Sequence, residues 1–549
     1  MPTTPSPDPD AAARETMRRV AEQRVAESLA PVWPLLAELG ERFEAAGHEL
    51  ALVGGPVRDA LLGRSGAPET VGPQDQAEPP EHAEPPEHAG PPEHAGPPEH
   101  AGPPEHAGPP EHAEPPEHAG PPWADLDLTT SAHPDAVLAL LDGWADTTWD
   151  VGIRFGTVGA RHGDHRLEVT TYRAESYDPS SRKPEVTYGD SLDGDLSRRD
   201  FTINALALRL PSGELVDRHD GLGDLARGVL RTPVTPDQSF GDDPLRMMRA
   251  ARFVSQLGVT PTPDVVEAMT AMAARLEIVS AERVRVELDK LLLGAHPRRG
   301  LGLMVDTGLA EYVLPELPTL QLEVDEHHRH KDVYEHSLTV LEQAIALEQS
   351  HRPASGPDLV LRLAALLHDI GKPRTRRFEP DGGVSFHHHE VVGARMVRKR
   401  LTALRYPQDT IDEVSTLVEL HLRFHGYAGG EWTDSAVRRY VRDAGPLLVR
   451  LHKLTRADST TRNRRKAAAL QRSYDHLEER IERLAEQEEL AAIRPDLDGN
   501  RIMAVLGIPP GREVGEAYRY LLELRLDRGP MGAEQAEAEL RAWWAAREA

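Results

Sequence analysis

The chain of 549 residues contains no cysteine, which excludes disulfide bonds and any metal site built from thiolate ligands. It also lacks a run of about 20 apolar residues, the length that a membrane-spanning helix requires, and it lacks the N-terminal pattern of a signal peptide. These absences predict a soluble cytoplasmic protein. The length predicts several domains rather than one.

Positive charge is scarce in this sequence. Lysine and arginine number 63 against 90 aspartates and glutamates, which gives a formal net charge of −27. Residues 65–122 contain 11 glutamates, one aspartate and no lysine or arginine, so they account for −12 and leave −15 for the rest. Because contacts to nucleic-acid phosphates normally come from lysine and arginine, any RNA binding must use local basic clusters. The candidates are residues 395–405 and the run from 450 to 466.

A repeat of Pro-Pro-Glu-His-Ala followed by Gly or Glu occurs seven times between Pro79 and Gly120. Proline pairs at this spacing exclude helix interiors and sheet ladders, so we expect residues 65–122 to be a disordered loop rich in polyproline II. At about 3.1 Å per residue, successive histidines lie roughly 19 Å apart, too far to share one metal without bending. We interpret the segment as a neutral insertion, which the slow growth of loop-closure cost with length permits; a metal-binding or pH-sensitive tether is the alternative. Residues 1–16 are expected to form a disordered tail.

Two aspartates one residue apart are the most informative feature that is present. Asp125 and Asp127 lie in the sequence Trp-Ala-Asp-Leu-Asp-Leu-Thr-Thr at 123–130. In an extended strand, residues i and i+2 point to the same face, so both carboxylates project together while Leu126 and Leu128 are buried behind them. Two like charges this close repel each other unless a cation lies between them, and Mg²⁺ favours carboxylate oxygens together with substrate phosphates. The pair predicts a metal site where the surroundings also bind phosphate.

Upstream, residues 52–63 predict a strand, a glycine turn and the start of a helix. Gly54 and Gly55 would let backbone N–H groups approach a phosphate, and Arg58 lies near the start of the helix. The segment lacks the Gly-Lys-Ser/Thr of a P-loop and does not match the Gly-x-Gly-x-x-Gly dinucleotide pattern. A plain strand-to-helix turn is the alternative interpretation.

Downstream, two further segments carry arginines. The first, at 198–208, reads Arg-Arg-Asp-Phe-Thr-Ile-Asn-Ala-Leu-Ala-Leu. In the second, at 242–253, Pro244 suits the first turn of a helix, with Asp242 or Asp243 as the N-cap. Charged residues then recur every three positions, a spacing that keeps neighbours on one side of a helix, at Asp243, Arg246, Arg249 and Arg252. Together with the carboxylate pair and the glycine turn, this stripe favours a phosphate-binding face over a solvated one.

These four segments resemble, in chain order, the motifs of the class II tRNA nucleotidyltransferases (CCA-adding enzymes) and of the bacterial poly(A) polymerases, within the polymerase-β-like superfamily. The family patterns are Gly-Gly-x-x-Arg-Asp, Asp-x-Asp, Arg-Arg-Asp-x-x-x-Asn-Ala and Glu-Asp-x-x-Arg. Asp242 stands where the family usually has glutamate, which is a conservative difference. The resemblance runs from about residue 30 to the C-terminus, outside the insertion.

The resemblance implies that Asp125 and Asp127 hold two divalent metals, with Mg²⁺ expected, which activate the 3′-hydroxyl of an RNA and steady the leaving pyrophosphate. Glu168 is a candidate third carboxylate on a neighbouring strand; an exposed strand glutamate is the alternative. The residues expected to bind the nucleotide are Gly54, Gly55, Arg58, Arg198, Arg199, Asp243, Arg246, Arg249 and Arg252.

Asp243 and Arg246 are expected to select the base. Cytosine N4 and adenine N6 are amino donors that a carboxylate accepts, and the neighbouring ring acceptors suit a guanidinium group. Uracil and guanine present a carbonyl oxygen where the carboxylate lies, so they are repelled. A site whose polar groups stay unpaired with the wrong ligand discriminates strongly, and protein side chains can thus specify C and A without a template.

A second group of metal-ligand residues lies on segments with helical apolar patterns in the middle of the chain. The order His…His-Asp…Asp resembles the HD phosphohydrolase domain, and this implies a first set of ligands at His336, His368, Asp369 and Asp458. His389 and His421 are candidates for a second metal. Imidazole with carboxylate suits several divalent ions, so the metal stays open. A metal there would supply hydroxide for phosphoester cleavage; whether the site is catalytic is left open.

We therefore expect an α+β protein: a small N-terminal nucleotidyltransferase sheet domain, then an all-α neck, an HD domain and a C-terminal helical body that binds RNA. In the neck, residues 282–292 predict a helix that buries Val284 and Leu288 and leaves its charged positions, Glu287 among them, outside. The expected segments are 1–30 (tail and leading helix), 31–217 (head, with the insertion 65–122), 218–325 (neck), 326–470 (HD domain) and 471–549 (C-terminal region).

The expected function is template-independent addition of C and A to tRNA 3′ ends, with CTP, ATP and tRNA as partners. A poly(A) polymerase is the alternative among nucleotidyltransferases, because the head motifs do not separate the two. From other classes, the chain could be an HD phosphohydrolase with an RNA-binding head, or an RNA-binding scaffold without turnover.

Overall fold

The computed structural model describes residues 9–64, 123–150, 153, 156–176, 185–188, 191–321, 332–380, 383–424, 432–460, 463–488 and 493–548. The insertion expected at 65–122, and residues 1–8 of the expected tail, lie outside the described residues. The chain divides into two compact units, Met1–Thr235 and Pro236–Ala549, and each is described by itself. None of the helices in the described stretches is long and apolar enough to span a bilayer.

The first unit is built on a seven-stranded sheet with the strand order β3-β4-β5-β2-β1-β8-β9. The pair β2–β5 is parallel, and the other neighbouring pairs are antiparallel. A separate hairpin consists of β6 (Arg173–Ser176) and β7 (Glu185–Tyr188). The strands of the sheet are β1 (Leu50–Val53), β2 (Asp125–Thr130), β3 (Thr147–Trp149), β4 (Thr157–His162), β5 (His165–Thr171), β8 (Leu206–Leu210) and β9 (Leu215–Asp217).

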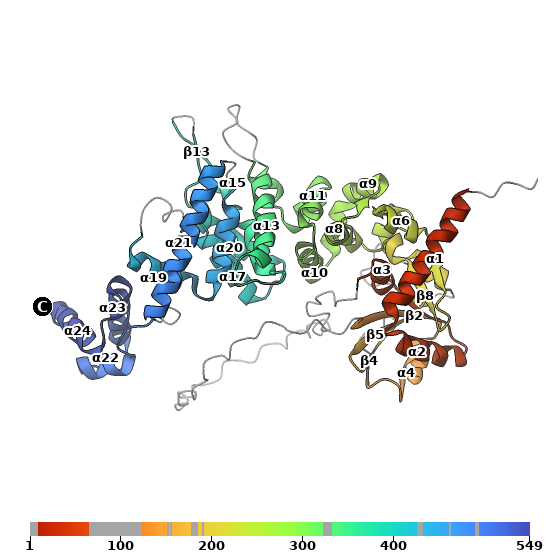
Figure 1. Cartoon of the computed structure of the whole chain (residues 1–549), viewed down its shortest axis with the longest axis horizontal. Helices are drawn as coiled ribbons and strands as arrows, with labels where there is room; N and C mark the ends of the chain where they lie inside the picture. Colours follow the sequence, from red (N-terminus) through yellow and green to blue (C-terminus); the bar gives the residue numbers. More distant parts are fainter. Residues whose placement is uncertain are drawn as a thin grey trace, which may run out of the picture. The chain divides into compact units, whose positions relative to one another are not determined.

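Alternation along the strands divides this unit into a large and a small core. On one face, leucines such as Leu52 and Leu128 pack with four helices into one buried cluster. On the other face, small residues such as Ala51 and Ala207 pack with α5 (Leu192–Ser197). The four helices are α1 (Pro9–Leu29), α2 (Trp33–Ala45), α3 (Gly55–Leu61) and α4 (Pro134–Leu141), with α1 beside α3 (Figure 1). Because α1 begins at Pro9, the expectation of a disordered tail is wrong for residues 9–16.

The second unit is mainly helical, as expected. Its first part is the neck, in which α8 packs against α10 and α11. The helix expected at 282–292 is confirmed as α10, with Val284 and Leu288 buried. The neck helices are α7 (Pro236–Asp242), α8 (Leu245–Leu257), α9 (Pro263–Met272), α10 (Ala281–Leu292), α11 (Pro297–Asp306) and α12 (Ala310–Val313).

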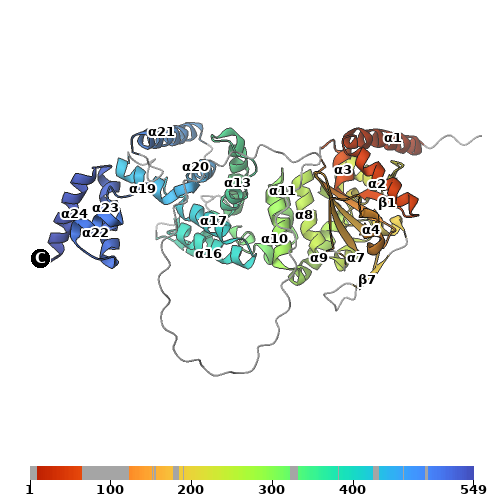
Figure 2. The same cartoon turned by 90° about the horizontal axis from the view of Figure 1, so that it is seen from below.

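The HD portion packs α13 against α14 and α20, and α17 against α14. Helix α17 also packs against α16 (Figure 2). Its elements are α13 (Val333–Ser350), α14 (Leu359–Leu367), α15 (Lys372–Thr375), β12 (Arg377–Phe378), β13 (Val384–Ser385), α16 (His389–Ala403), α17 (Gln408–Leu420), α19 (Asp434–Ala444) and α20 (Leu448–Asp458). Three C-terminal helices share a core of their own: α22 (Gly499–Leu506), α23 (Arg512–Arg528) and α24 (Ala533–Glu548).

Helix α21 (Arg464–Glu488) runs across the position 470/471, where the sequence suggested a domain boundary. It is attached to the HD portion by a stack of Tyr474 on Phe424, whose ring centroids lie 3.8 Å apart. Arg456 of α20 also donates to Glu478 of α21 at 2.9 Å. At least the middle of α21 therefore packs with the HD helices.

Candidate nucleotide-binding and metal-binding sites

The carboxylate pair lies on strand β2 as the sequence predicts. Asp125 and Asp127 are exposed, whereas Leu126 and Leu128 are buried. In the parallel pair β2–β5, Asp127 is opposite Glu168. Directly opposed residues of a ladder project to the same face, so Glu168 lies on the neighbouring strand on the side of both aspartates. The three side chains offer oxygen ligands only, a set that fits Mg²⁺.

Arg166 is a member of this face that the sequence analysis missed. It is opposite Asp125 in the ladder, and its Nη2 donates to Glu168 Oε1 at 3.0 Å. Its guanidinium carbon lies 5.3 Å from the centre of the Trp149 ring. The sequence contained one indication of this contact. Arg166 and Glu168 are two residues apart on a predicted strand, so their side chains project to the same face. A cation thus already contacts one carboxylate of the acidic face.

The glycine turn connects β1 to α3 as expected. Gly54 has a φ of 73°, in the left-handed region that favours glycine. A Cβ atom on Gly54 would lie 3.1 Å from Nη1 of Arg199. The turn and the Arg-Arg-Asp segment, which are more than 140 residues apart in sequence, are therefore in contact.

Arg58 is held inside the first unit rather than presented on its surface. Its side chain is buried, and Nη1 donates to Asn204 Oδ1 at 2.8 Å. Its Nε and Nη2 donate to the carboxylate of Asp59, each at 2.9 Å. Asn204 in turn donates to Asp200 Oδ1 at 3.0 Å. In this structure Arg58 joins the glycine turn to the Arg-Arg-Asp-x-x-x-Asn segment. Its expected contact with the triphosphate stays a prediction.

Arg198 and Arg199 are oriented by one buried carboxylate. Asp195, 1% exposed, accepts from Arg198 at 3.0 Å and from Arg199 at 3.2 Å. Burial opposes ionisation of Asp195, but the guanidinium groups of Arg199 and Arg198 hold its pKa below the ordinary value. The sequence analysis did not single out Asp195. Asp195 fixes both arginines, and one of them, Arg199, lies beside the glycine turn, where it could bind phosphate.

In the second unit, Asp243 and Arg246 are held near the start of α8. Pro244 occupies the N-cap, so the N-cap lies one residue after Asp243 and two after Asp242, the two candidates from the sequence. One oxygen of Asp243 accepts from the N–H of Leu245 at 3.0 Å, and the other accepts from Arg283 at 3.2 Å. Arg246 is mostly buried, and its Nη1 donates to Ser239 Oγ at 2.9 Å. Both candidate base-selecting side chains are thus oriented by neighbours.

Arg252 does not extend this site as a solvent-facing side chain, whereas Arg249 is partly exposed. Arg252 is 2% exposed, and its Nε lies 2.7 Å from Glu287, which also pairs with Arg249 at 3.6 Å. The expectation that Glu287 faces outward is wrong, because it is buried against these two arginines. Three residues turn an α-helix by about 300°, so positions six apart differ by roughly 120°. The stripe therefore winds around α8, and Arg252 faces the interior.

Some side chains of the basic run 450–466 are buried and stabilise the fold. Lys453 is 1% exposed and donates to the carbonyl oxygen of Pro353 at 3.0 Å. Arg456 is mostly buried, with its guanidinium group on Asp475 and Glu478. These two side chains stabilise the HD portion, so the interpretation of this part of the run as an RNA-binding surface is wrong.

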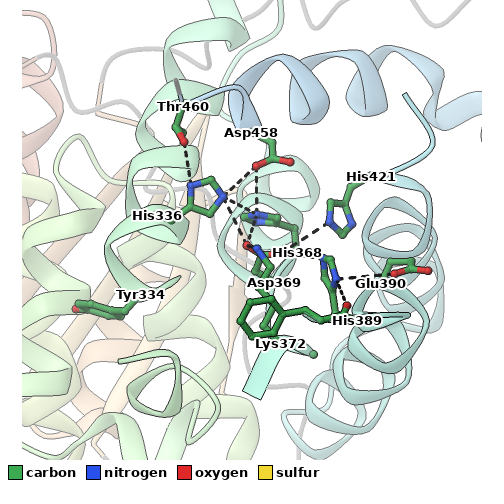
Figure 3. A network of polar contacts seen from close by, with 12 residues as sticks. Tyr334, His336, His368, Asp369, Lys372, His389, Glu390, His421, Asp458 and Thr460 are labelled. Carbon is green, nitrogen blue, oxygen red and sulfur yellow. Dashed lines mark hydrogen bonds and ion pairs between the residues drawn. The ribbon is translucent and has the colours of Figure 1, made fainter. Parts of the chain in front are cut away.

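The HD portion brings all six expected ligands together (Figure 3). Asp369 links two groups. Its Oδ2 lies 3.1 Å from His368 and 3.5 Å from His336, whereas its Oδ1 lies 3.2 Å from His389 and 4.0 Å from His421. In the described part of the chain, two groups of three residues have ligand atoms within 4.8 Å of one another. One group is His336, His368 and Asp458, and the other is Asp369, His389 and His421.

The histidines are oriented for metal binding. Nδ1 of His368, His389 and His421 lies 2.6 to 2.9 Å from a backbone carbonyl oxygen. In the neutral form of each ring, Nδ1 therefore carries the hydrogen and Nε2 offers its lone pair. Nε2 of His389 and of His421 is buried without a hydrogen-bond partner. Burial lowers the pKa of His421 to about 3, which keeps it as the neutral imidazole that binds metals. These residues fit one or two divalent ions.

Lys372 also contacts this site, with Nζ 2.6 Å from Asp369 Oδ2. Burial opposes ionisation of Asp369, but His368, His389 and Lys372 hold its pKa well below the ordinary value. Asp369 is therefore an anion shared among cations and imidazoles, as a bridging ligand must be.

The fold and these two sites define a nucleotidyltransferase with an attached HD domain. Three family profiles agree with this description. They are "Poly A polymerase head domain" at residues 118–231, "Probable RNA and SrmB- binding site of polymerase A" at 258–320 and "HD domain" at 333–463.

Known relatives identify the family. The chain is 38% identical over 361 residues to the A-adding tRNA nucleotidyltransferase of Deinococcus radiodurans, which covers 64% of this chain and 80% of the relative. It is 44% identical over 189 residues to the CCA-adding enzyme of Levilactobacillus brevis, which covers 34% of this chain and 46% of that enzyme. The chain belongs to the tRNA nucleotidyltransferase family, so the resemblance seen in the sequence is confirmed.

Solved structures confirm the expected α+β fold. The CCA-adding enzyme of Bacillus stearothermophilus, solved in complex with CTP, matches with a TM-score of 0.61 at 22% identity over 95% of this chain and 98% of that chain. The CCA-adding enzyme of Thermotoga maritima matches with a TM-score of 0.54 at 17% identity, over 95% and 98% of the two chains. At these identities the likeness establishes the fold alone.

Replacing Gly371 with alanine is expected to disturb the HD site. A Cβ atom there would lie 2.2 Å from the carbonyl oxygen of His389 and 2.8 Å from the nitrogen of Gly393. Both are backbone atoms, so the turn after α14 and the start of α16 must separate, at a cost of about 1–3 kcal/mol. Titration calorimetry with Mn²⁺ and urea unfolding should both show weakening.

The matched control is Gly302→Ala in α11, where no heavy atom lies within 4 Å of the added Cβ atom. Alanine favours a helix more than glycine does, so this variant should keep or gain stability. Undiminished Mn²⁺ binding by Gly371→Ala would show that the site does not need this close backbone contact.

Proposed function

We propose that the protein adds C and A to the 3′ ends of tRNA from CTP and ATP, without a nucleic-acid template. The observation that carries the proposal is the exposed pair Asp125 and Asp127 with Glu168 opposite, in the same unit as a glycine turn packed on Arg199. Relatives named as CCA-adding and A-adding tRNA enzymes support this class of reaction. We place the activity in the cytoplasm, where tRNA is available.

The roles proposed for the head follow from its charges. Asp125 and Asp127 would hold divalent cations, expected to be Mg²⁺, which supply activation of the RNA 3′-hydroxyl and neutralisation of the leaving pyrophosphate. Arg198 and Arg199, already fixed by Asp195, would hold the triphosphate so that its α-phosphate is in line with the hydroxyl. Glu168 would add a third carboxylate to the acidic face.

The first test is incorporation of labelled CTP and ATP into tRNA lacking CCA and into tRNA ending in CC. The parent should add C and then A to the first tRNA, and A to the second. Asp125→Asn with Asp127→Asn should abolish both additions, whereas Asp135→Asn, an exposed aspartate of α4, should leave them unchanged. If only A is incorporated, and only into the tRNA that ends in CC, the enzyme adds the terminal A alone and our proposal of C and A addition is wrong. Long A tracts would replace it with poly(A) synthesis.

Asp243 is proposed to select the base, because its carboxylate is held by Leu245 N–H and Arg283. Asp243→Ala should relax discrimination against UTP and GTP by about 10- to 100-fold, with a much smaller change in the KM for CTP. Asp243→Asn keeps an acceptor for the helix start but adds an amide donor, so it should favour UTP. Misincorporation rates measure both, and Asp264→Ala, an exposed aspartate of α9, is the control. Strict nucleotide choice in Asp243→Ala would refute the assignment.

A second activity is favoured by the six-residue HD site, and we propose that it hydrolyses phosphoesters. The site would hold divalent metal, which supplies a hydroxide nucleophile near neutral pH. His368→Ala should lower hydrolysis of 2′,3′-cyclic AMP with added Mn²⁺ by about 100-fold or more without lowering CTP incorporation. His388→Ala, whose side chain is 83% exposed, is the control. Equal hydrolysis by the parent and His368→Ala would place the activity elsewhere.

A further inference from the structure

A short hairpin is attached directly to the HD site. Strands β12 and β13 pair Phe378 with Val384. The hairpin follows Asp369 and Lys372 in the chain and leads into His389, so site residues lie at both of its ends. A molecule that contacts the hairpin would be within reach of the candidate metal ligands.

The hairpin and the helix before it carry unpaired positive charge. No ion pair with another described residue is formed by Arg374, Arg376 or Arg377. Many arginines elsewhere in this acidic chain do form ion pairs. Among the described residues of the hairpin, Glu379 is an acid, and it accepts from the hydroxyl of Ser385. The net charge of the chain is −27. A cluster of arginines without an ion-pair partner in the described stretches is therefore a local exception, and it suits a polyanion.

An exposed aromatic ring lies within the same cluster. Phe378 is 72% exposed, and the guanidinium carbon of Arg376 lies 4.8 Å from the centre of its ring. Exposing a phenylalanine at this level costs solvation free energy unless a partner covers it. Arginines beside an exposed aromatic ring are the combination that binds single-stranded nucleic acid, since the ring stacks on a base while the cations contact phosphates.

We propose that the hairpin with Arg374, Arg376, Arg377 and Phe378 binds a single-stranded RNA and directs its 3′-terminal phosphate into the HD site. This inference rests on the proposed phosphoesterase function and names its substrate class. In the reaction, the oxygen of water bonds to phosphorus, one ribose P–O bond of the terminal phosphate breaks, and the ribose oxygen takes a proton. The hairpin touches the strand and determines specificity; it takes no part in the bond changes.

The test compares a hexaribonucleotide that ends in a 2′,3′-cyclic phosphate with 2′,3′-cyclic AMP, using the full chain with added Mn²⁺. The two substrates share the reacting group, so a change confined to the hexamer reports on the strand. Phe378→Ala, and Arg376→Ala with Arg377→Ala, should raise the KM for the hexamer about tenfold. The kcat, and both constants for cyclic AMP, should change less than twofold. Tyr518→Ala, an aromatic side chain of α23 that is 37% exposed, is the control.

An unchanged KM for the hexamer, or an equal rise for both substrates, would overturn the inference. Hydrolysis of neither substrate by the parent would instead refute the phosphoesterase proposal. In that case binding of a fluorescent hexamer, followed by anisotropy, decides about the hairpin. A dissociation constant about tenfold higher in Phe378→Ala would support RNA binding by the hairpin, and an unchanged one would overturn it.

Discussion

Like-charge repulsion on one face of a sheet is the constraint on which the first unit depends. Asp125 and Asp127 share a face with Glu168, and negative groups in such proximity repel one another. The strand cannot relieve this by slipping one residue, because Leu126 and Leu128 would then move from the core into water. The large core therefore holds the carboxylates on one face, where a cation would stabilise them. Arg166 supplies one positive group in this structure, and the proposed metals would supply the rest.

Buried carboxylates in both units act as anchors for pairs of arginines. Asp195, Asp224 and Glu287 are each at most 5% exposed, and each contacts two guanidinium groups. Removing both arginines from such a carboxylate would leave an uncompensated buried charge, which is strongly destabilising. Some of the many acidic residues in the composition therefore have a structural role in the interior. These buried carboxylates fix arginines in position, and one of the fixed arginines, Arg199, lies beside the glycine turn.

The sequence predicted those features that depend on local pattern. The alternation in β2, the glycine turn before α3 and the apolar stripe of α10 were all confirmed, since each follows from the periodicity of one segment. Features that depend on distant partners were missed. The pairing of Arg252 with Glu287, 35 residues later, and the hydrogen bond of Arg58 to Asn204 cannot be seen in the pattern of a single segment.

The HD ligands show how helix ends prepare a metal site. His368 and His421 are the C-caps of α14 and α17, where backbone carbonyls lack helical partners. Each ring donates Nδ1–H to the carbonyl three residues upstream, and His389 does the same to Phe386.

The hydrogen bonds that satisfy these carbonyls thereby fix the tautomer of each ring and aim each Nε2 at Asp369. The hydrogen bonds that complete the helix ends thus also orient the metal ligands. The only further requirement is that several helices end at the same place. The apolar packing of α13, α14, α17 and α20 brings those ends together, so the same burial that stabilises the HD portion assembles its polar centre.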